Sequence, residues 1–204
     1  WKAATYMRPR DADISISAIQ VGTEEIIDSQ RKAEIFLETF FPKMAEPEIE
    51  EASPAEELPW EPITEEEIYR SLRVTKGTTA PGRDGIPTLV WKHLWTSLKE
   101  IITTIFTRSV DLGYYPREWK QARIIILRKP GKPNHTVPGA YRPISLPNTL
   151  GKLLEAVMAR RLSYWVEKHK LLPDTQFGGR PGRNAEQALL VLANAVDRAS
   201  VRSR

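Results

Sequence analysis

The chain has 204 residues, enough for one domain of ordinary size with a buried core. It has no cysteine and only three widely spaced histidines, which excludes a disulfide framework, a thiolate metal site and a zinc site of ordinary spacing. No apolar run approaches the roughly 20 residues that span a bilayer, and no signal peptide opens the chain, so we expect no membrane partner and a nuclear or cytoplasmic location.

The net charge of +4 conceals a strong asymmetry along the chain. Residues 1–70 carry 17 acidic and 7 basic side chains, a net charge of −10, whereas residues 71–204 carry 9 acidic and 23 basic side chains, a net charge of +14. A strongly basic half favours a polyanionic partner, because each neutralised phosphate releases a condensed counterion. The alternative is that these charges form an ordinary solvated surface.

The first predicted elements are helical. Apolar residues recur every three or four positions from Thr23 to Phe41, and Pro42 ends this pattern. Residues 46–60 are rich in Glu, Pro and Ala and have few large apolar residues, which is typical of a flexible acidic connector. Thr64 then begins a capping box for a short helix over residues 65–73.

A loop rich in glycine and proline, residues 77–87, separates this short helix from the next helical segments. It is not a phosphate-binding loop of the Walker type, because no Gly-Lys-Ser or Gly-Lys-Thr follows at the required spacing. Thr88–Trp95 is predicted to be helical, and a second amphipathic helix follows and closes at Gly113. The side chains that we expect this second helix to bury are Leu98, Ile101, Ile102, Ile105, Phe106 and Val110.

The apolar run at residues 124–127 is short and β-branched and stops at Pro130-Gly131, which predicts a buried strand. We expect a small sheet of two or three strands built from residues 121–128 and 140–146. Cations lie beyond both ends of the run, and a rigid strand that delivers Arg and Lys to a turn suits phosphate binding. A core strand with a solvated basic turn is the alternative.

The longest helix is predicted to begin at Asn148 or Thr149. A second loop rich in glycine and proline follows at residues 171–183. Asn184 and Gln187 then form the reciprocal cap of a last helix. Its apolar side is formed by Leu189, Leu190, Leu192 and Val196.

Four segments, in order, resemble the reverse transcriptase domain of non-LTR (LINE-type) retrotransposons. The segment APGRDGIP at 80–87 resembles the signature that opens this domain, and WKQARIIILRKPGKP at 119–133 resembles its first fingers motif. The segments YRPISLPNTLGKLLEAVMARRL at 141–162 and LLPDTQFGGRPGRNAEQAL at 171–189 resemble the motifs that follow. Four ordered motifs are far more specific than one.

The resemblance implies an α+β fold: the mostly helical fingers and partial palm of a right-hand polymerase, with a small β-sheet, in an incomplete domain. It also implies a domain order. Residues 1–45 are expected to be a helical linker upstream of the polymerase, 46–60 the acidic flexible connector, and 61–204 the N-terminal part of the reverse transcriptase domain.

The resemblance also implies roles for individual residues. Lys129 and Arg142 correspond to the residues that bind the triphosphate of the incoming deoxynucleotide (dNTP). Arg83, Arg123, Arg128 and Lys132 are expected to contact template nucleic acid or solvent. The residues that match the segment lying along the template are Gln176, Gly178 and Arg180. The sequence departs from the family pattern at Arg83 and at Gly179, where the family usually has Phe.

Nucleotide addition by two metal ions needs paired carboxylates, which the family supplies from an Asp-rich strand and a Tyr-x-Asp-Asp turn. Neither motif occurs in the sequence, so we expect no catalytic or metal-binding residue in this chain. The chain is thus expected to be a fragment of an RNA-directed DNA polymerase, a nucleotidyltransferase that uses Mg²⁺ at full length, and to be inactive alone.

The partners expected for the chain are an RNA template, a DNA primer, dNTP, the missing C-terminal palm and thumb, and an upstream endonuclease of the same polyprotein. Two alternatives stay open from the sequence: a non-catalytic nucleic-acid-binding remnant, and an interaction module whose basic face binds an acidic partner.

Overall fold

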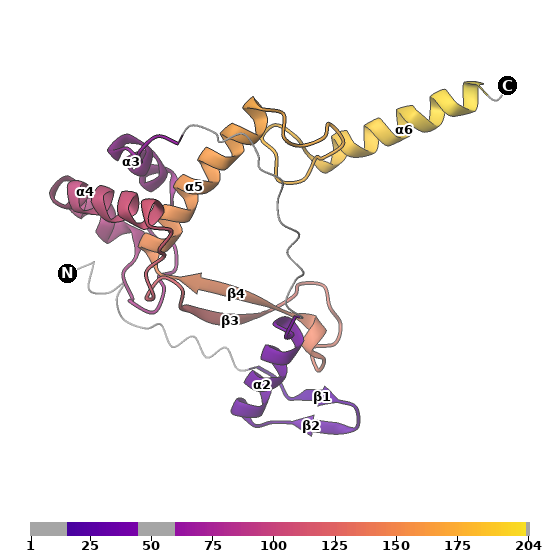
Figure 1. Cartoon of the computed structure of the whole chain (residues 1–204). Helices are drawn as coiled ribbons and strands as arrows, with labels where there is room; N and C mark the ends of the chain where they lie inside the picture. Colours follow the sequence, from indigo (N-terminus) through magenta and orange to yellow (C-terminus); the bar gives the residue numbers. More distant parts are fainter. Residues whose placement is uncertain (1–15, 45–59, 203–204) are drawn as a thin grey trace. The chain divides into compact units, whose positions relative to one another are not determined.

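The computed structural model describes residues 16–44 and 60–202 of the chain (Figure 1). These residues form five α-helices and two antiparallel sheets of two strands each, so the fold is α+β and mostly helical, as predicted. The chain divides into two compact units, residues 1–152 and 153–204.

The first described elements are a β-hairpin and a helix. β1 (Ile19–Val21) pairs with β2 (Glu24–Ile26) across a turn in which Gly22 has a φ of +62°, a backbone conformation that favours glycine. α2 (Ser29–Phe40) follows, and the Asp28 side chain accepts a hydrogen bond of 2.7 Å from the backbone N–H of Arg31. The predicted helix start at Thr23 was wrong, because residues 24–26 pair with β1 and the cap lies at Asp28.

α3 (Glu65–Val74) begins at the predicted capping box. The Thr64 hydroxyl accepts from the backbone N–H of Glu67 at 3.3 Å, and the Glu67 carboxylate accepts from the backbone N–H of Thr64 at 2.9 Å. Ile68 and Leu72 are buried. The prediction of a short capped helix is therefore confirmed, with its end one residue beyond the predicted one.

α4 (Thr88–Asp111) is one continuous helix rather than two, since no glycine or proline interrupts residues 88–111. It ends before Gly113, whose φ of +58° suits a helix C-terminus. Ile102 and Phe106 are buried as predicted, but Ile101 remains 58% exposed. The predicted core face of this helix was therefore too wide.

The predicted small sheet is a two-stranded hairpin of β3 (Ala122–Arg128) and β4 (Tyr141–Pro147), with the 3-10 turn η1 (Pro138–Ala140) before β4. The predicted bounds are confirmed to within one residue. The expectation of a buried strand was wrong, because Ile124 and Leu127 are each more than a third exposed. A hairpin without a third strand cannot cover both of its faces by itself.

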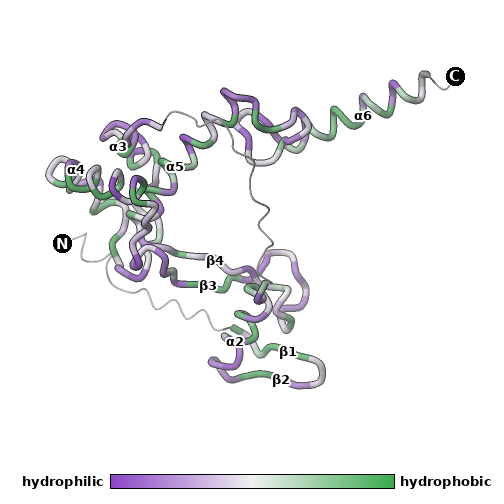
Figure 2. The backbone as a smooth tube through the Cα atoms, in the orientation of Figure 1, coloured by the Kyte–Doolittle hydropathy of each residue, from purple (hydrophilic) through white to green (hydrophobic). Residues whose placement is uncertain are grey.

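α5 (Thr149–Lys168) and α6 (Ala185–Arg202) complete the described fold. α4 is longer than α5, contrary to the prediction. Reciprocal hydrogen bonds of 3.0 and 2.9 Å between Asn184 and Gln187 confirm the predicted cap of α6. Figure 2 shows the hydrophobic positions along α6; the exposed ones are Leu189, Leu190, Val191, Leu192 and Val196.

Within the described ranges, no helix is both long and apolar enough to span a membrane.

The loop at residues 77–87 is held against the start of α5. The Thr149 hydroxyl donates to the carbonyl of Ile86 at 2.7 Å, and the ammonium of Lys152 donates to the carbonyl of Ala80 at 3.1 Å. Gly82 is buried there, and a Cβ atom at Gly82 would lie 2.6 Å from the backbone nitrogen and 2.7 Å from the Cα of Asn148. The glycine is thus required by close approach to the chain's own backbone.

Replacing Gly82 with Ala should lower the free energy of unfolding by about 1–3 kcal/mol, because the added methyl group overlaps backbone atoms that cannot move independently. The matched control is Gly139→Ala: no atom lies within 4 Å of the added Cβ, and its φ is not positive. Urea unfolding followed by circular dichroism measures both variants. Equal stability of the two would contradict the close approach.

Candidate functional site

The β3–β4 hairpin places both residues predicted to bind the triphosphate on one face. Arg142 lies opposite Leu127, and the ladder extends one residue further through a hydrogen bond of 2.8 Å from the backbone N–H of Lys129 to the carbonyl of Ala140. Cross-strand partners share a face, and residues two apart on a strand also share a face. Lys129 and Arg142 are therefore diagonal neighbours on the same face.

We call this side of the hairpin the open face. It comprises Arg123, Ile125, Leu127, Lys129, Arg142, Ile144 and Leu146, and none of these side chains is buried. The opposite face, which we call the covered face, carries Tyr141 in a buried hydrophobic cluster and Ile126 packed against it, whereas Ile124 further along the strand is 39% exposed. The hairpin thus has one face that is covered near the loop and one face that presents cations between aliphatic side chains.

The two residues predicted to bind the triphosphate differ in their contacts with the rest of the chain. Arg142 is exposed, and no hydrogen bond or ion pair joins its guanidinium to the described part of the chain. Lys129 is partly buried, and its ammonium donates to the carbonyl of Gly139 at 2.8 Å. This bond uses one of three ammonium donors, so two remain for a ligand.

The other predicted basic residues near the hairpin are not gathered at one place. Arg123 is exposed on the open face at the far end of the ladder, opposite Leu146. Arg128 lies on the covered side and donates to the hydroxyl of Ser17 at 2.7 Å. Lys132 is exposed in the loop between the strands.

Arg83, predicted to contact the template from the 77–87 loop, is exposed and donates to the side-chain carbonyl of Gln121 at 2.7 Å. Gln121 directly precedes β3. The bond joins the loop to the base of the hairpin, and the rest of the guanidinium faces solvent.

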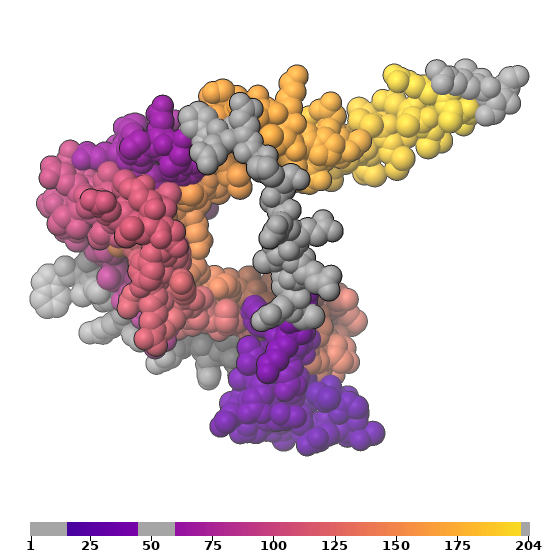
Figure 3. Space-filling model, viewed as in Figure 1, coloured from indigo at the N-terminus to yellow at the C-terminus, as the bar shows by residue number. Residues whose placement is uncertain are grey.

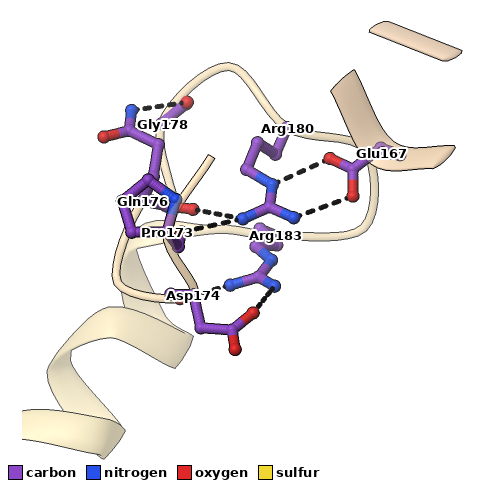
Figure 4. Close-up of polar contacts among 7 residues, drawn as sticks. All are labelled: Glu167, Pro173, Asp174, Gln176, Gly178, Arg180 and Arg183. Carbon is purple, nitrogen blue, oxygen red and sulfur yellow. Dashed lines mark hydrogen bonds and ion pairs between the residues drawn. The ribbon is translucent and has the colours of Figure 1, made fainter. Parts of the chain in front are cut away.

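In the second unit, the predicted template residues lie in the loop at 171–183 (Figure 4). Arg180 donates to both carboxylate oxygens of Glu167 at 2.8 Å, and its Nη1 also donates to the carbonyls of Pro173 and Gln176 at 3.0 and 3.4 Å. The amide of Gln176 donates to the carbonyl of Gly178 at 3.0 Å. Arg180, with only 6% of its side chain exposed, is therefore engaged within its own loop.

A second arginine adds to the same network. Arg183 donates to the backbone carbonyl of Asp174 and, at 3.2 Å, to its carboxylate, and its guanidinium lies 5.4 Å from the ring centre of Phe177. Gly179, at the position where the sequence departs from the family pattern, has a φ of +74°, which favours glycine.

The ion pair between Glu167 and Arg180 changes the acidity of the carboxylate. The hydrogen bonds from the Arg180 guanidinium lower the pKa of Glu167 below its ordinary value, and the positive charge of the same group acts in the same direction. The carboxylate is therefore held in its charged form.

In the part of the chain that the structure describes, no group of three or more His, Cys, Asp or Glu side chains is arranged to hold a metal ion. These residues do not fit the Mg²⁺ ions that a nucleotidyltransferase needs.

Sequence reasoning missed two residues that hold this region together. Asn148 is buried beside Gly82, and its amide donates to the carbonyl of Glu118 at 3.2 Å. Tyr141 is 1% exposed, and its hydroxyl donates to the carbonyl of His135 at 2.8 Å. Both residues lie within the motif at 141–162, and the burial that identifies them comes from tertiary packing.

No protein-family model matches the chain. Among curated proteins, it is 36% identical over 185 residues to the 115 kDa protein in the type-1 retrotransposable element R1DM of Drosophila melanogaster, covering 89% of this chain and 17% of that protein. It is 34% identical over 123 residues to the RNA-directed DNA polymerase from the mobile element jockey of Drosophila melanogaster, covering 60% of this chain and 13% of that polymerase.

A third relative is the retrovirus-related Pol polyprotein from the type-1 retrotransposable element R1 of Bradysia coprophila, 32% identical over 60% of this chain and 12% of the polyprotein. The chain thus spans less than a fifth of the length of these relatives. By these similarities, the chain is related to the RNA-directed DNA polymerases of non-LTR retrotransposons.

Proposed function

We propose that this chain is the fingers and the start of the palm of a reverse transcriptase, and that it binds template nucleic acid and the triphosphate of the incoming deoxynucleotide. The observation that carries the proposal is the diagonal placement of Lys129 and Arg142 on the open face. The relation to RNA-directed DNA polymerases supports the choice of ligand.

The chemistry of phosphoryl transfer makes this pair useful. The reaction depends largely on positioning and on neutralising the charge of the phosphates. Arg142 offers a planar fork that binds two phosphate oxygens at once, whereas Lys129 offers a compact charge with two remaining donors. Diagonal neighbours on a sheet lie about 7–8 Å apart, within the reach of long side chains, so one triphosphate can engage both.

The aliphatic side chains of the open face add to this arrangement. Ile125, Leu127 and Ile144 lie beside the cations and are not buried. Apolar atoms exclude water from the neighbourhood of an ion pair, and a drier site strengthens each electrostatic contact with the phosphates.

We further propose that the isolated chain holds substrates without joining them. The family's Tyr-x-Asp-Asp turn is absent from the sequence. In this proposal the carboxylates that hold the Mg²⁺ ions belong to residues outside this chain. The chain itself binds and orients the template and the nucleotide.

The basic residues are proposed to have different tasks. Arg123 and Lys132 are exposed, and we assign them to the nucleic-acid backbone, where charge matters more than geometry. Arg180 is assigned to holding the 171–183 loop in shape through Glu167, so that the exposed Gln176 and Gly178 can face the template.

Charge reversal at Arg142 tests the triphosphate site. Arg142→Glu should weaken binding of a fluorescent deoxynucleoside triphosphate roughly tenfold or more, because a charge-assisted bond is replaced by repulsion. It should leave the affinity for a single-stranded RNA oligonucleotide nearly unchanged. Fluorescence anisotropy at fixed salt measures both affinities.

The matched control for this test is Arg123→Glu, which changes the same charge on the same face at the far end of the ladder. It should weaken RNA binding and spare the nucleotide. If each variant weakens both ligands equally, the hairpin is a diffuse basic surface and the assignment of Arg142 is wrong.

A primer-extension assay tests the proposed division of labour. The chain, incubated with an RNA template, an annealed DNA primer, all four deoxynucleotides and Mg²⁺, should give no extended primer on a sequencing gel. Metal-dependent extension that persists through repeated purification would contradict the proposal that the catalytic carboxylates lie elsewhere.

The role assigned to Arg180 predicts a dependence of stability on pH. Because the folded-state pKa of Glu167 is lowered, its ion pair stabilises the fold above the ordinary carboxyl pKa of 4.5 and is lost as the pH falls through the lowered pKa. Glu167→Gln should therefore lower the free energy of unfolding at neutral pH and flatten its fall in acid.

Urea unfolding at several pH values between neutrality and about pH 3 measures this effect. Asp197→Asn is the matched control, since it neutralises an exposed carboxylate on α6 in the same unit. A pH profile for Glu167→Gln that is as steep as that of the parent chain would show that the ion pair does not stabilise the loop.

A further inference from the structure

The segment at residues 16–41 packs against the covered face of the β3–β4 hairpin, at the end that carries the connecting loop. We call this segment the brace; it contains β1, β2 and α2. Ile19 and Phe36 from the brace and Ala140 and Tyr141 from the hairpin form one buried cluster, each 3% exposed or less. In Figure 1, α2 and the β1–β2 hairpin lie beside the end of β3–β4 that carries the connecting loop.

The aromatic rings of the cluster make specific contacts. The rings of Phe36 and Tyr141 meet edge to face with centroids 5.2 Å apart, and Phe40 stacks on Phe36 at 5.7 Å. Aromatic pairs of this kind have preferred geometries. They therefore favour one orientation of the hairpin against the brace, and they also bury apolar surface. Figure 3 shows the brace as a closely packed group of atoms, coloured indigo.

Hydrogen bonds tie the brace to the connecting loop. The backbone N–H of Gln20 donates to the carbonyl of Thr136 at 2.6 Å, and the Arg128 guanidinium donates to the hydroxyl of Ser17 at 2.7 Å. The ammonium of Lys32, a buried residue, donates to the carbonyl of Ile16 at 2.9 Å and so anchors the residues before β1 on α2. These bonds join the brace to the loop at Thr136 and to the end of β3 at Arg128, and they fix the brace internally.

The loop at residues 129–140 contains three prolines and two glycines. Its ends are joined by bonds from the backbone N–H and the ammonium of Lys129 to the carbonyls of Ala140 and Gly139, and its other internal bonds are short-range contacts within the loop. A two-stranded hairpin is marginally stable in water by itself. Tyr141 links the brace to the loop. Its ring packs on Phe36 of the brace, and its hydroxyl donates to the carbonyl of His135 in the loop.

Tyr141 also lies next to the predicted triphosphate ligands along the ladder. Its cross-strand partner is Arg128, which directly precedes Lys129, and it is itself followed by Arg142. Because neighbouring residues point to opposite faces of a strand, fixing Tyr141 in the buried cluster directs both Lys129 and Arg142 toward the open face.

We propose that the brace is part of the nucleotide-binding apparatus rather than a spacer, and that Tyr141 is the positioning residue through which it acts. The brace contacts one face of the hairpin, and the ligand binds the other. This inference rests on the proposed triphosphate site at Lys129 and Arg142 and adds a requirement for upstream residues that never contact the nucleotide.

Two mild substitutions test the brace. Tyr141→Phe keeps the ring and removes the bond to His135, and Phe36→Leu keeps an apolar side chain and removes the ring contact from the brace side. Each should weaken binding of Mg²⁺-bound deoxynucleoside triphosphate about three- to tenfold, the range that one net hydrogen bond or aromatic pair contributes. Each should also speed hydrogen exchange of the amides at residues 134–140.

Tyr114→Phe is the matched control, because Tyr114 is exposed and lies outside the hairpin and the brace. It should change neither nucleotide affinity nor loop exchange. Amide exchange in α3, which is not in the brace, should stay at the parent rate in all three variants, since an overall loss of stability would raise it everywhere.

Lys129→Ala distinguishes a failure of the proposed triphosphate site from a failure of the inference about the brace. If Lys129→Ala leaves nucleotide affinity unchanged, the proposed triphosphate site is wrong, and unchanged loop exchange in Tyr141→Phe and Phe36→Leu would then overturn the brace as well. If Lys129→Ala weakens binding but the two brace variants bind nucleotide like the parent, the segment is only structural and the inference is overturned.

Discussion

The register of the β3–β4 ladder is the constraint on which the arrangement of this region depends. Side chains on a strand alternate between faces, so a shift of β4 by one residue would turn Arg142 toward the hydrophobic cluster, away from the face of Lys129, and Tyr141 toward water. A buried charge would then lack a partner, which is costly, and the aromatic contact with Phe36 would be lost. The apolar cluster on one face therefore determines where the cations point on the other.

A steric constraint accounts for a glycine in the loop at residues 77–87. Glycine in such a loop permits close approach of the backbone to another group. Gly82 approaches the backbone of Asn148, where Thr149 and Lys152 also bind the loop. The loop and the base of the hairpin are thereby held together, and the start of β3 is tied to the same point through Arg83 and Gln121.

Local signals in the sequence were sufficient for much of this fold. The capping boxes at Thr64 and Asn184 and the bounds of the hairpin follow from a few adjacent residues, and the structure has them nearly where they were predicted. The errors concern burial. Ile101 has the same periodicity as Ile102, yet it is exposed, because periodicity identifies an apolar stripe and only tertiary packing decides how much of that stripe is covered.

The candidate site shows a similar limit. The resemblance identified Lys129 and Arg142 by position, and alternation then placed them on one face. The packing of residues 16–41 against the hairpin had no comparable signal, since the bond from Gln20 to Thr136 joins positions far apart in the chain. The helix predicted from Thr23 also concealed β2, which pairs with the strand that carries Ile19 into the cluster.

The basic side chains that give residues 71–204 their large positive charge do not form a single basic surface. Arg180 and Arg183 are engaged with carboxylates and carbonyls of their own loop, and their charge is largely neutralised locally. Arg142 and Arg123 have no such partner among the described residues and keep their full capacity to attract an anion. The net charge counts partnered and exposed arginines equally, whereas attraction of an anion depends mainly on the exposed ones. One arginine is thus paired with Glu167 inside its own loop, whereas another lies exposed beside Leu127, where its planar fork is open to an anion.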